Sequence, residues 1–126
     1  MNKYVVILLL AFSGSAFAES YLCISEAAGG VREKFSLGKI NGLAYTTDTK
    51  WVVRNESGSW LVTEYGRTAP SFDYCNIDTV NTIRCGDHVG QVFYYHIDSG
   101  TYDTYMIRFS ESYIDHVIER GRCTKI

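Results

Sequence analysis

Three histidines, His88, His96 and His116, are the side chains in this sequence best suited to acid–base or metal chemistry. No H-x-H or H-E-x-x-H spacing occurs, so they form no recognisable metal-binding motif. His116 directly follows Asp115, but neighbouring residues of a strand point to opposite faces, so these two would not pair as a base and its carboxylate. The sequence therefore predicts three solvent-facing or rim histidines and no metal site.

Nucleophiles and phosphate-binding loops give no stronger signal. The chain lacks the G-x-S-x-G elbow of serine hydrolases, and its glycines are scattered rather than gathered in one loop. Carboxylates are plentiful, but a glycosidase pair must lie about 5 to 9.5 Å apart, and the sequence does not reveal which carboxylates converge. We therefore predict no catalytic residue and no cofactor.

Tyrosine is unusually frequent, with ten in the chain. Tyrosines are enriched in recognition surfaces because they offer a large contact area at a low cost in conformational entropy. The candidate binding residues are Tyr94, Tyr95, His96, Tyr102 and Tyr105 in the C-terminal third and Asn55 in a predicted turn. The alternative interpretation is that these tyrosines are ordinary strand residues.

Residues 1–18 have the three parts of a secretory signal peptide. Lys3 supplies a basic start, Tyr4–Phe12 is apolar, and Ala16-Phe17-Ala18 is an A-x-A cleavage signature. The apolar run is shorter than the about 20 residues that a bilayer span needs, although an ordinary N-terminal anchor helix remains the alternative. We predict cleavage after Ala18, no stable membrane anchor afterwards, and a periplasmic or secreted single β domain over residues 19–126.

Net charge argues against one class of partner. Cleavage would remove Lys3 and no acid, which changes the formal net charge from −2 to −3. The chain has no basic tract, so nucleic acid is not a predicted partner.

Four cysteines follow the signal: Cys23, Cys75, Cys85 and Cys123. An even number in a short exported chain is typical of two disulfides. Of the three possible pairings we favour a local Cys75–Cys85 bond and a Cys23–Cys123 bond between the ends. In the chain-entropy model, the local bond stabilises the folded state by about 3 kcal/mol and the bond between the ends by about 4 to 5 kcal/mol. A metal site is the rival interpretation, but no C-x-x-C or paired Cys/His spacing supports it.

Two β-hairpins are the clearest structural elements. Trp51–Arg54 and Trp60–Tyr65 are rich in β-branched and aromatic residues, and they flank the turn formers Asn55-Glu56-Ser57-Gly58. This turn also matches the N-x-[ST] glycosylation pattern, which we interpret as turn chemistry. Gln91–Ile97 and Thr101–Phe109 form the second hairpin. We expect at least one of the two tryptophans in the core.

The remaining segments are less regular. Tyr21–Ile24 is predicted as the first strand, and Ser25–Gly30 as a break with a turn at its two glycines. Val31–Gly42 fits one or two short strands, and Tyr113–Ile118 fits a strand or a short helical turn. With no long helical period, the sequence predicts an all-β fold: a small antiparallel barrel or sandwich of about seven to nine strands, linked by disulfides.

Eight short motifs stand in order along the chain: Tyr21-Leu22-Cys23, Gly29-Gly30-Val31, Trp51-Val52-Val53, Ser59-Trp60-Leu61-Val62, Ile83-Arg84-Cys85, Gly90-Gln91-Val92-Phe93, Gly100-Thr101-Tyr102 and Gly121-Arg122-Cys123. Together they resemble an uncharacterised family of small exported, disulfide-containing proteins of Gram-negative bacteria and their phages. One departure is Gly38-Lys39-Ile40, where a tryptophan would be expected after the lysine. The resemblance implies export and a disulfide-linked β domain, but it supplies no activity.

A more distant analogy, at the level of fold only, is to periplasmic inhibitors of C-type lysozyme, which are small β-barrels with an early Y-x-C and a late cysteine. These observations predict an exported binding module, of which an inhibitor of an envelope or foreign protein is one form. Loops and aromatic side chains on a rigid β scaffold would meet a protein or glycan partner in the envelope or outside the cell. The alternative is a small hydrolase acting on envelope polymers, with His116 and nearby carboxylates.

Overall fold

The computed structural model of the chain describes residues 19–35, 38–45, 49–78 and 81–126. The predicted signal peptide lies outside the described residues. These contain nine β-strands and no helix. The strands are β1 (Glu19–Lys34), β2 (Lys39–Ala44), β3 (Lys50–Glu56), β4 (Ser59–Glu64), β5 (Tyr74–Ile77), β6 (Thr82–Gly86), β7 (Val92–His96), β8 (Thr101–Phe109) and β9 (Tyr113–Lys125).

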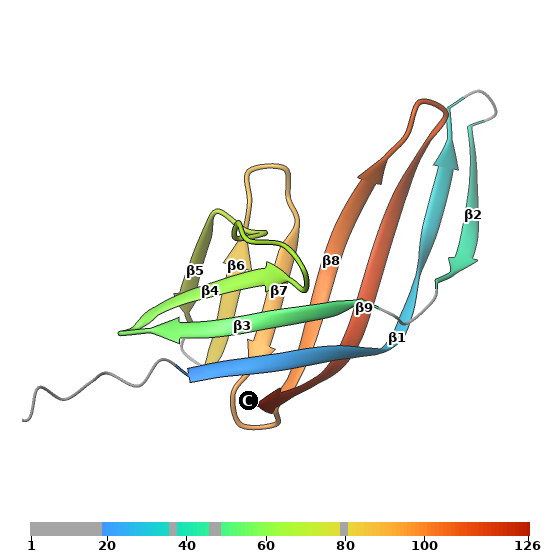
Figure 1. The fold of residues 1–126 in the computed structure, drawn as a ribbon. Coiled ribbons are helices and arrows are strands. Elements are labelled where there is room, and N and C mark those ends of the chain that lie inside the picture. Colours follow the sequence, from blue (N-terminus) through green and yellow to red (C-terminus); the bar gives the residue numbers. More distant parts are fainter. Residues whose placement is uncertain (1–18, 36–37, 46–48, 79–80) are drawn as a thin grey trace, which may run out of the picture.

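Eight of the strands form a nearly closed antiparallel barrel (Figure 1). Their order around the barrel is β4-β3-β1-β9-β8-β7-β6-β5, and β2 lies off this path, paired with β1. The segment after β4 crosses the seam, because the Ser71 N–H donates to the carbonyl of Val62 at 2.8 Å and the Asp73 N–H donates to that of Gly86 at 3.0 Å. The prediction of a small all-β antiparallel barrel is confirmed.

Both predicted hairpins are present, as β3–β4 and β7–β8. At the tip of the first, Ser57 has a φ of 54° and Gly58 one of 90°. The Gly58 N–H donates to the side-chain oxygen of Asn55 at 2.9 Å, which closes the turn. Trp51 is buried in the core, while Trp60 packs against the edge of the core.

The predicted break at Ser25–Gly30 is wrong, because β1 continues through it to Lys34. β9 runs antiparallel to β1 from end to end and supplies hydrogen-bond partners along this stretch, with one irregularity between Ser25 and Ala27. A Cβ on Gly30 would overlap the backbone carbonyl of His116. The glycine therefore permits a close approach of two strands rather than a turn. Tyr113–Ile118, which the sequence left open, belongs to the single long strand β9.

Aromatic rings fill the interior of the barrel. Phe93 stacks on Tyr102 with ring centroids 5.2 Å apart and meets Trp51 edge-on at 5.6 Å. Phe72 packs against both Trp51 and Phe93 at 5.9 Å. These rings bury a large apolar area in a small domain, so they are the main source of its hydrophobic stabilisation.

The two favoured disulfides are confirmed. Cys23–Cys123 links directly opposed residues of β1 and β9, and Cys75–Cys85 does the same for β5 and β6. Bonds of this kind persist in oxidising compartments, which agrees with the expected export. Within the described part of the chain, no helix has the length and apolarity needed to cross a membrane.

Three barrel strands continue beyond the barrel and, together with β2, form a single-layered sheet, which we call the extension (Figure 1). It consists of Gly29–Lys34 of β1, all of β2, Tyr113–Ile118 of β9 and Met106–Phe109 of β8. It exists because β1 pairs with β3 only over Glu19–Ile24, and β7 pairs with β8 only as far as Tyr105. Beyond these points β1, β8 and β9 leave the barrel together.

Gly121→Ala is expected to lower the free energy of unfolding by about 1–3 kcal/mol. A Cβ at this position would overlap the carbonyl oxygen of Ile24 and lie 2.6 Å from a ring carbon of the buried Tyr102. Gly42→Ala is the matched control, because nothing lies within 4 Å of its added Cβ; its change should stay within about 0.5 kcal/mol. Urea unfolding measures both, and equal effects would contradict the predicted crowding at Gly121.

Candidate functional site

The structure does not bring the predicted binding residues together. Alternation along β7 and β8 sends some inward and others outward. Tyr95 and Tyr102 are 3% and 0% exposed and belong to the core. The other four are partly exposed and lie in three places: Tyr94 and His96 on the outer wall of the barrel, Tyr105 near the extension, and Asn55 near the end of β3, beside the β3–β4 turn. A single tyrosine-rich surface made of all these residues is therefore not formed.

The outer face of the extension is apolar and hollowed. We call it the outer patch and define it by Val31 of β1, Ile40 of β2, Tyr105 of β8, and His116 and Ile118 of β9. Together with Gly30 and Glu33 these residues line a hollow of about 400 Å³. Val31, Ile40 and Ile118 are 40%, 68% and 61% exposed. In this face the Tyr105 hydroxyl and His116 Nδ1 are hydrogen-bonded at 2.5 Å.

The inner face of the same layer is polar. Arg32 of β1 donates two hydrogen bonds to its cross-strand neighbour Asp115 of β9, from Nε at 2.7 Å and from Nη2 at 2.9 Å. The Arg32 guanidinium also lies 3.7 Å from the ring centroid of Tyr113. The hydrogen bonds from Arg32 lower the pKa of Asp115, against the opposing effect of its burial. This pair fixes β1 to β9 in the part of the sheet that lacks a second layer.

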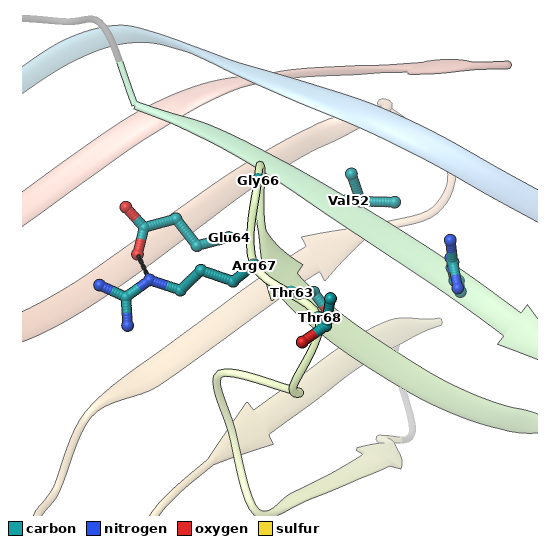
Figure 2. A pocket seen from close by; sticks show the side chains of 7 residues that line it. Val52, Thr63, Glu64, Gly66, Arg67 and Thr68 are labelled. Carbon is teal, nitrogen blue, oxygen red and sulfur yellow. Dashed lines mark ion pairs between the residues drawn. The ribbon is translucent and has the colours of Figure 1, made fainter.

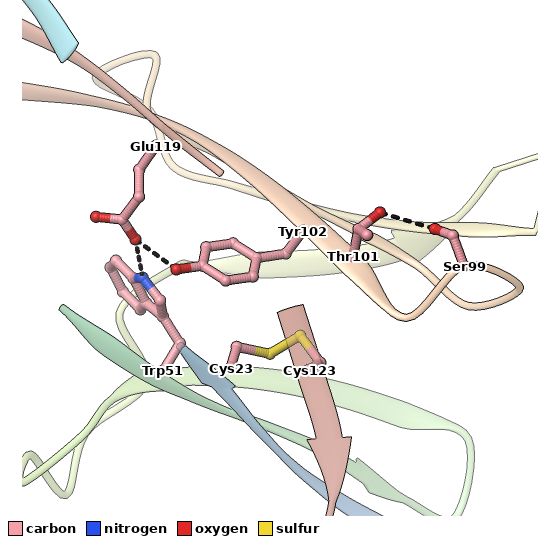
Figure 3. The surroundings of a disulfide bond; sticks show 7 residues. All are labelled: Cys23, Trp51, Ser99, Thr101, Tyr102, Glu119 and Cys123. Carbon is pink, nitrogen blue, oxygen red and sulfur yellow. Dashed lines mark hydrogen bonds between the residues drawn. A yellow bond between two sulfur atoms is a disulfide. The ribbon is translucent and has the colours of Figure 1, made fainter. Parts of the chain in front are cut away.

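A buried carboxylate lies where the inner face enters the barrel. Glu119 is 6% exposed, and its Oε1 accepts hydrogen bonds from Trp51 Nε1 at 2.9 Å and from the Tyr102 hydroxyl at 2.7 Å (Figure 3). Burial, and then the carboxylate beside it, raise the pKa of the Tyr102 phenol. A pocket of about 260 Å³ opens above Glu119. Its other lining residues are Thr49, Trp51, Glu64, Arg67, Met106, Arg108 and Val117.

Sequence reasoning missed Glu119. The available signal was the alternation of β9, which places Asp115, Val117 and Glu119 on one face. Two carboxylates on the same face as a buried valine indicate a polar site within the sheet rather than a solvated surface.

A second polar constellation lies on the outer wall of the barrel. Thr82 Oγ1 is 3.2 Å from His96 Nδ1, and His96 Nε2 is 2.8 Å from Asp103 Oδ2. With the imidazole proton on Nε2, the threonine hydroxyl donates to the ring and the ring donates to the carboxylate. Arg120 Nε lies 2.9 Å from the other oxygen of Asp103. Thr82, His96 and Arg120 also line a pocket of about 240 Å³. Strand register alone brings Thr82, His96 and Asp103 together, so the sequence did not reveal them.

The other two histidines lie apart from this group. His88 is exposed and 2.6 Å from Asp73. His116 points away from Asp115, because Asp115 is bound to Arg32 on the inner face and His116 to Tyr105 on the outer face. The expectation that these neighbours do not pair is confirmed. Among the described residues, no three His, Cys, Asp or Glu side chains converge as a metal site.

A further pocket of about 240 Å³ lies beside the β3–β4 hairpin (Figure 2). Its lining includes Val52, Thr63 and the ion pair between Arg67 Nε and Glu64 Oε2 at 3.2 Å. These two opposite charges satisfy each other, so the pocket offers a ligand little unpaired charge.

No protein-family model, curated protein or solved structure matches this chain. The candidate sites of this protein are therefore the outer patch, the pocket above Glu119 and the Thr82–His96–Asp103 group.

Asp115→Asn is expected to lower the free energy of unfolding at pH 7 by about 1–3 kcal/mol, because it removes the charge that satisfies the Arg32 guanidinium. The folded-state pKa of Asp115 is lowered, so ionised Asp115 stabilises the folded state. This contribution is complete above the unfolded-state pKa of about 4 and is lost as pH falls through the lower folded-state pKa. The stability difference between wild type and variant should therefore shrink on acidification. Urea unfolding from pH 7 to acid measures it.

Glu111→Gln is the control for Asp115→Asn, because it removes an exposed carboxylate from the turn between β8 and β9. Its stability curve should follow that of the wild type. An Asp115→Asn difference that is constant with pH would contradict the role given to the Arg32 ion pair.

Proposed function

We propose that the protein is an exported binding module that holds a protein partner on the outer patch. The observation that carries this proposal is an apolar face on a single-layered sheet. Sheets bury their apolar face against another layer, and among the described elements nothing covers this one. Exposed contiguous apolar surface on a folded protein marks an interaction site.

The chemistry of the patch favours a protein over a membrane or a glycan. Glu33 is the one acidic residue among the described residues that line the hollow, and the mature chain is expected to be acidic, which disfavours anionic lipid headgroups. The largely apolar lining offers few groups to satisfy sugar hydroxyls. The partner that fits presents apolar side chains beside a basic residue facing Glu33. The edge of β2, whose described partner is β1 alone, gives room for an added strand.

The expected compartment is the periplasm or the outside of the cell. The two disulfides support this, together with the predicted signal peptide. An inhibitor of an envelope or foreign protein would be a module of this kind, acting by covering its target.

Ile118→Ser is expected to abolish retention of the partner in a pull-down from Gram-negative envelope extract, because it removes a large, 61% exposed apolar side chain from the patch. Ile77→Ser on β5 is a matched control, since Ile77 is 60% exposed and Ile118 61%. The oxidised protein is the bait, mass spectrometry identifies what is retained, and the purified partner is then bound again in isolation.

A partner that binds wild type and Ile77→Ser but not Ile118→Ser supports the proposal. Equal binding by both variants overturns it. A dimer in sedimentation that is lost on Ile118→Ser would instead assign the patch to a second copy of the chain.

A small hydrolase is the second candidate, favoured by the Thr82–His96–Asp103 group. The arrangement matches a hydroxyl, base and orienting carboxylate, although it uses His96 rather than the predicted His116. It supports catalysis less well than the patch supports binding, because Thr82 is 5% exposed and Arg120 shares the carboxylate.

If this group is catalytic, hydrolysis of a p-nitrophenyl ester should fall at least about 100-fold in His96→Gln. His88→Gln, which alters an exposed histidine elsewhere, should hydrolyse the ester at the wild-type rate. Wild-type protein without activity above that of His96→Gln would remove the hydrolase candidate.

A further inference from the structure

The pocket above Glu119 has an unusual distribution of charge. Both hydrogen bonds to Glu119 end on Oε1, and the described residues give none to Oε2, which points away from the donors in Figure 3. A buried carboxylate is costly unless its charge is matched. Its neighbours Trp51 and Tyr102 donate neutral hydrogen bonds and leave the negative charge without a cation.

The opposite charge lies at the other end of the pocket. The inward cross-strand pairs of β8 and β9 follow one another as Thr104–Glu119, Met106–Val117 and Arg108–Asp115. Arg108 is exposed, its guanidinium lies 5.9 Å from the centroid of the Tyr45 ring, and no ion pair joins it to a described residue. After the hydrogen bonds from Arg32, the charge of Arg108 also lowers the pKa of Asp115. Because both oxygens of Asp115 already accept from Arg32, the positive charge of Arg108 is only partly matched. Four residues of strand separate the levels of Glu119 and Arg108, or about 13 Å.

Between these two charges one level of the strand wall is apolar. Met106 and Val117 form one level of the wall, and the Trp51 ring lies beside Glu119. The remaining charges, Glu64 and Arg67, neutralise each other at 3.2 Å. Along the strands the lining thus runs from the Glu119 carboxylate past an apolar level to the Arg108 guanidinium, which is only partly matched by Asp115.

We propose that this pocket binds a lysine with a free carboxylate, either the amino acid or the C-terminal residue of a peptide. The ammonium group lies at Glu119 Oε2 and the carboxylate at the Arg108 guanidinium. The aliphatic stem between them packs against Met106, Val117 and the face of Trp51, which also attracts a cation. This site is on the inner side of the sheet, opposite the outer patch, and does not depend on the partner proposed there.

The test is titration of the oxidised protein with Nα-acetyl-L-lysine, followed by tryptophan fluorescence, to which Trp51 and Trp60 both contribute, and by calorimetry. Saturable binding is expected. Nε-acetyl-L-lysine lacks the ammonium group and Nα-acetyl-L-lysinamide lacks the carboxylate, so each should bind at least about tenfold more weakly. Free L-lysine distinguishes the source: binding tighter than that of Nα-acetyl-L-lysine indicates the amino acid, and weaker binding indicates a peptide end.

Two variants assign the ends of the ligand. Glu119→Gln keeps an oxygen for Trp51 and Tyr102 but removes the charge, and it should weaken Nα-acetyl-L-lysine at least about tenfold while leaving Nε-acetyl-L-lysine unchanged. Arg108→Gln, at an exposed position, should remove the preference for the acid over the amide. Arg54→Gln, an exposed arginine on β3, is the control and should bind as the wild type does.

Several results would overturn the proposal. These are equal affinities for Nα-acetyl- and Nε-acetyl-L-lysine, unchanged binding by a folded Glu119→Gln protein, or no saturable signal up to about 10 mM ligand. If Glu119→Gln does not fold, the ligand series on wild type and the Arg108→Gln variant still decide the matter.

Discussion

The pairing of β1 with β9 is the constraint on which the rest of the structure depends. It runs from Tyr21 opposite Lys125 to Lys34 opposite Tyr113. Cys23–Cys123 fixes it in the barrel and Arg32–Asp115 fixes it in the extension. The barrel closes on one side of this pair and the extension grows from its far end. Without the covalent link, a pairing of such high sequence separation would have to offset a large loop-closure entropy by packing alone.

The proposed binding surfaces follow from the same ladder. Because successive residues of β9 face opposite sides, His116 and Ile118 lie in the outer patch, while Val117 and Glu119 line the inner pocket. The inner side can hold charge because Arg32, Trp51 and Tyr102 supply donors to its carboxylates. The outer side has no comparable network across its apolar residues, so burial against another molecule is the means by which it would be stabilised.

The sequence predicted what is local and failed where distant strands decide. The two hairpins and the Cys75–Cys85 bond were predicted because turn residues, alternation and close cysteine spacing are visible within short stretches. Cys23–Cys123 joins distant strands, but it follows once Cys75 and Cys85 are paired, because those are the two cysteines that remain. The turn at Gly29-Gly30 was wrong because β9, far along the chain, holds that segment straight. Alternation places Tyr94 and Tyr95 on opposite faces of β7, but it does not say which face is inward. Burial had to be seen before Tyr95 and Tyr102 could be recognised as core residues.

The polar sites escaped prediction because they also depend on the pairing of strands that are distant in the sequence. Thr82, His96 and Asp103 meet only because β6, β7 and β8 are paired in one register. Shifting any of these pairings by one residue would turn a member to the other face. Glu119 meets Trp51 through strands at distant points of the sequence. The sequence of a short strand shows its periodicity but not which strands it pairs with. The register of strand pairing therefore determines which polar side chains meet in a barrel. Since one strand serves both faces, a substitution at Ile118 changes the outer patch while the side chains that line the inner pocket stay the same.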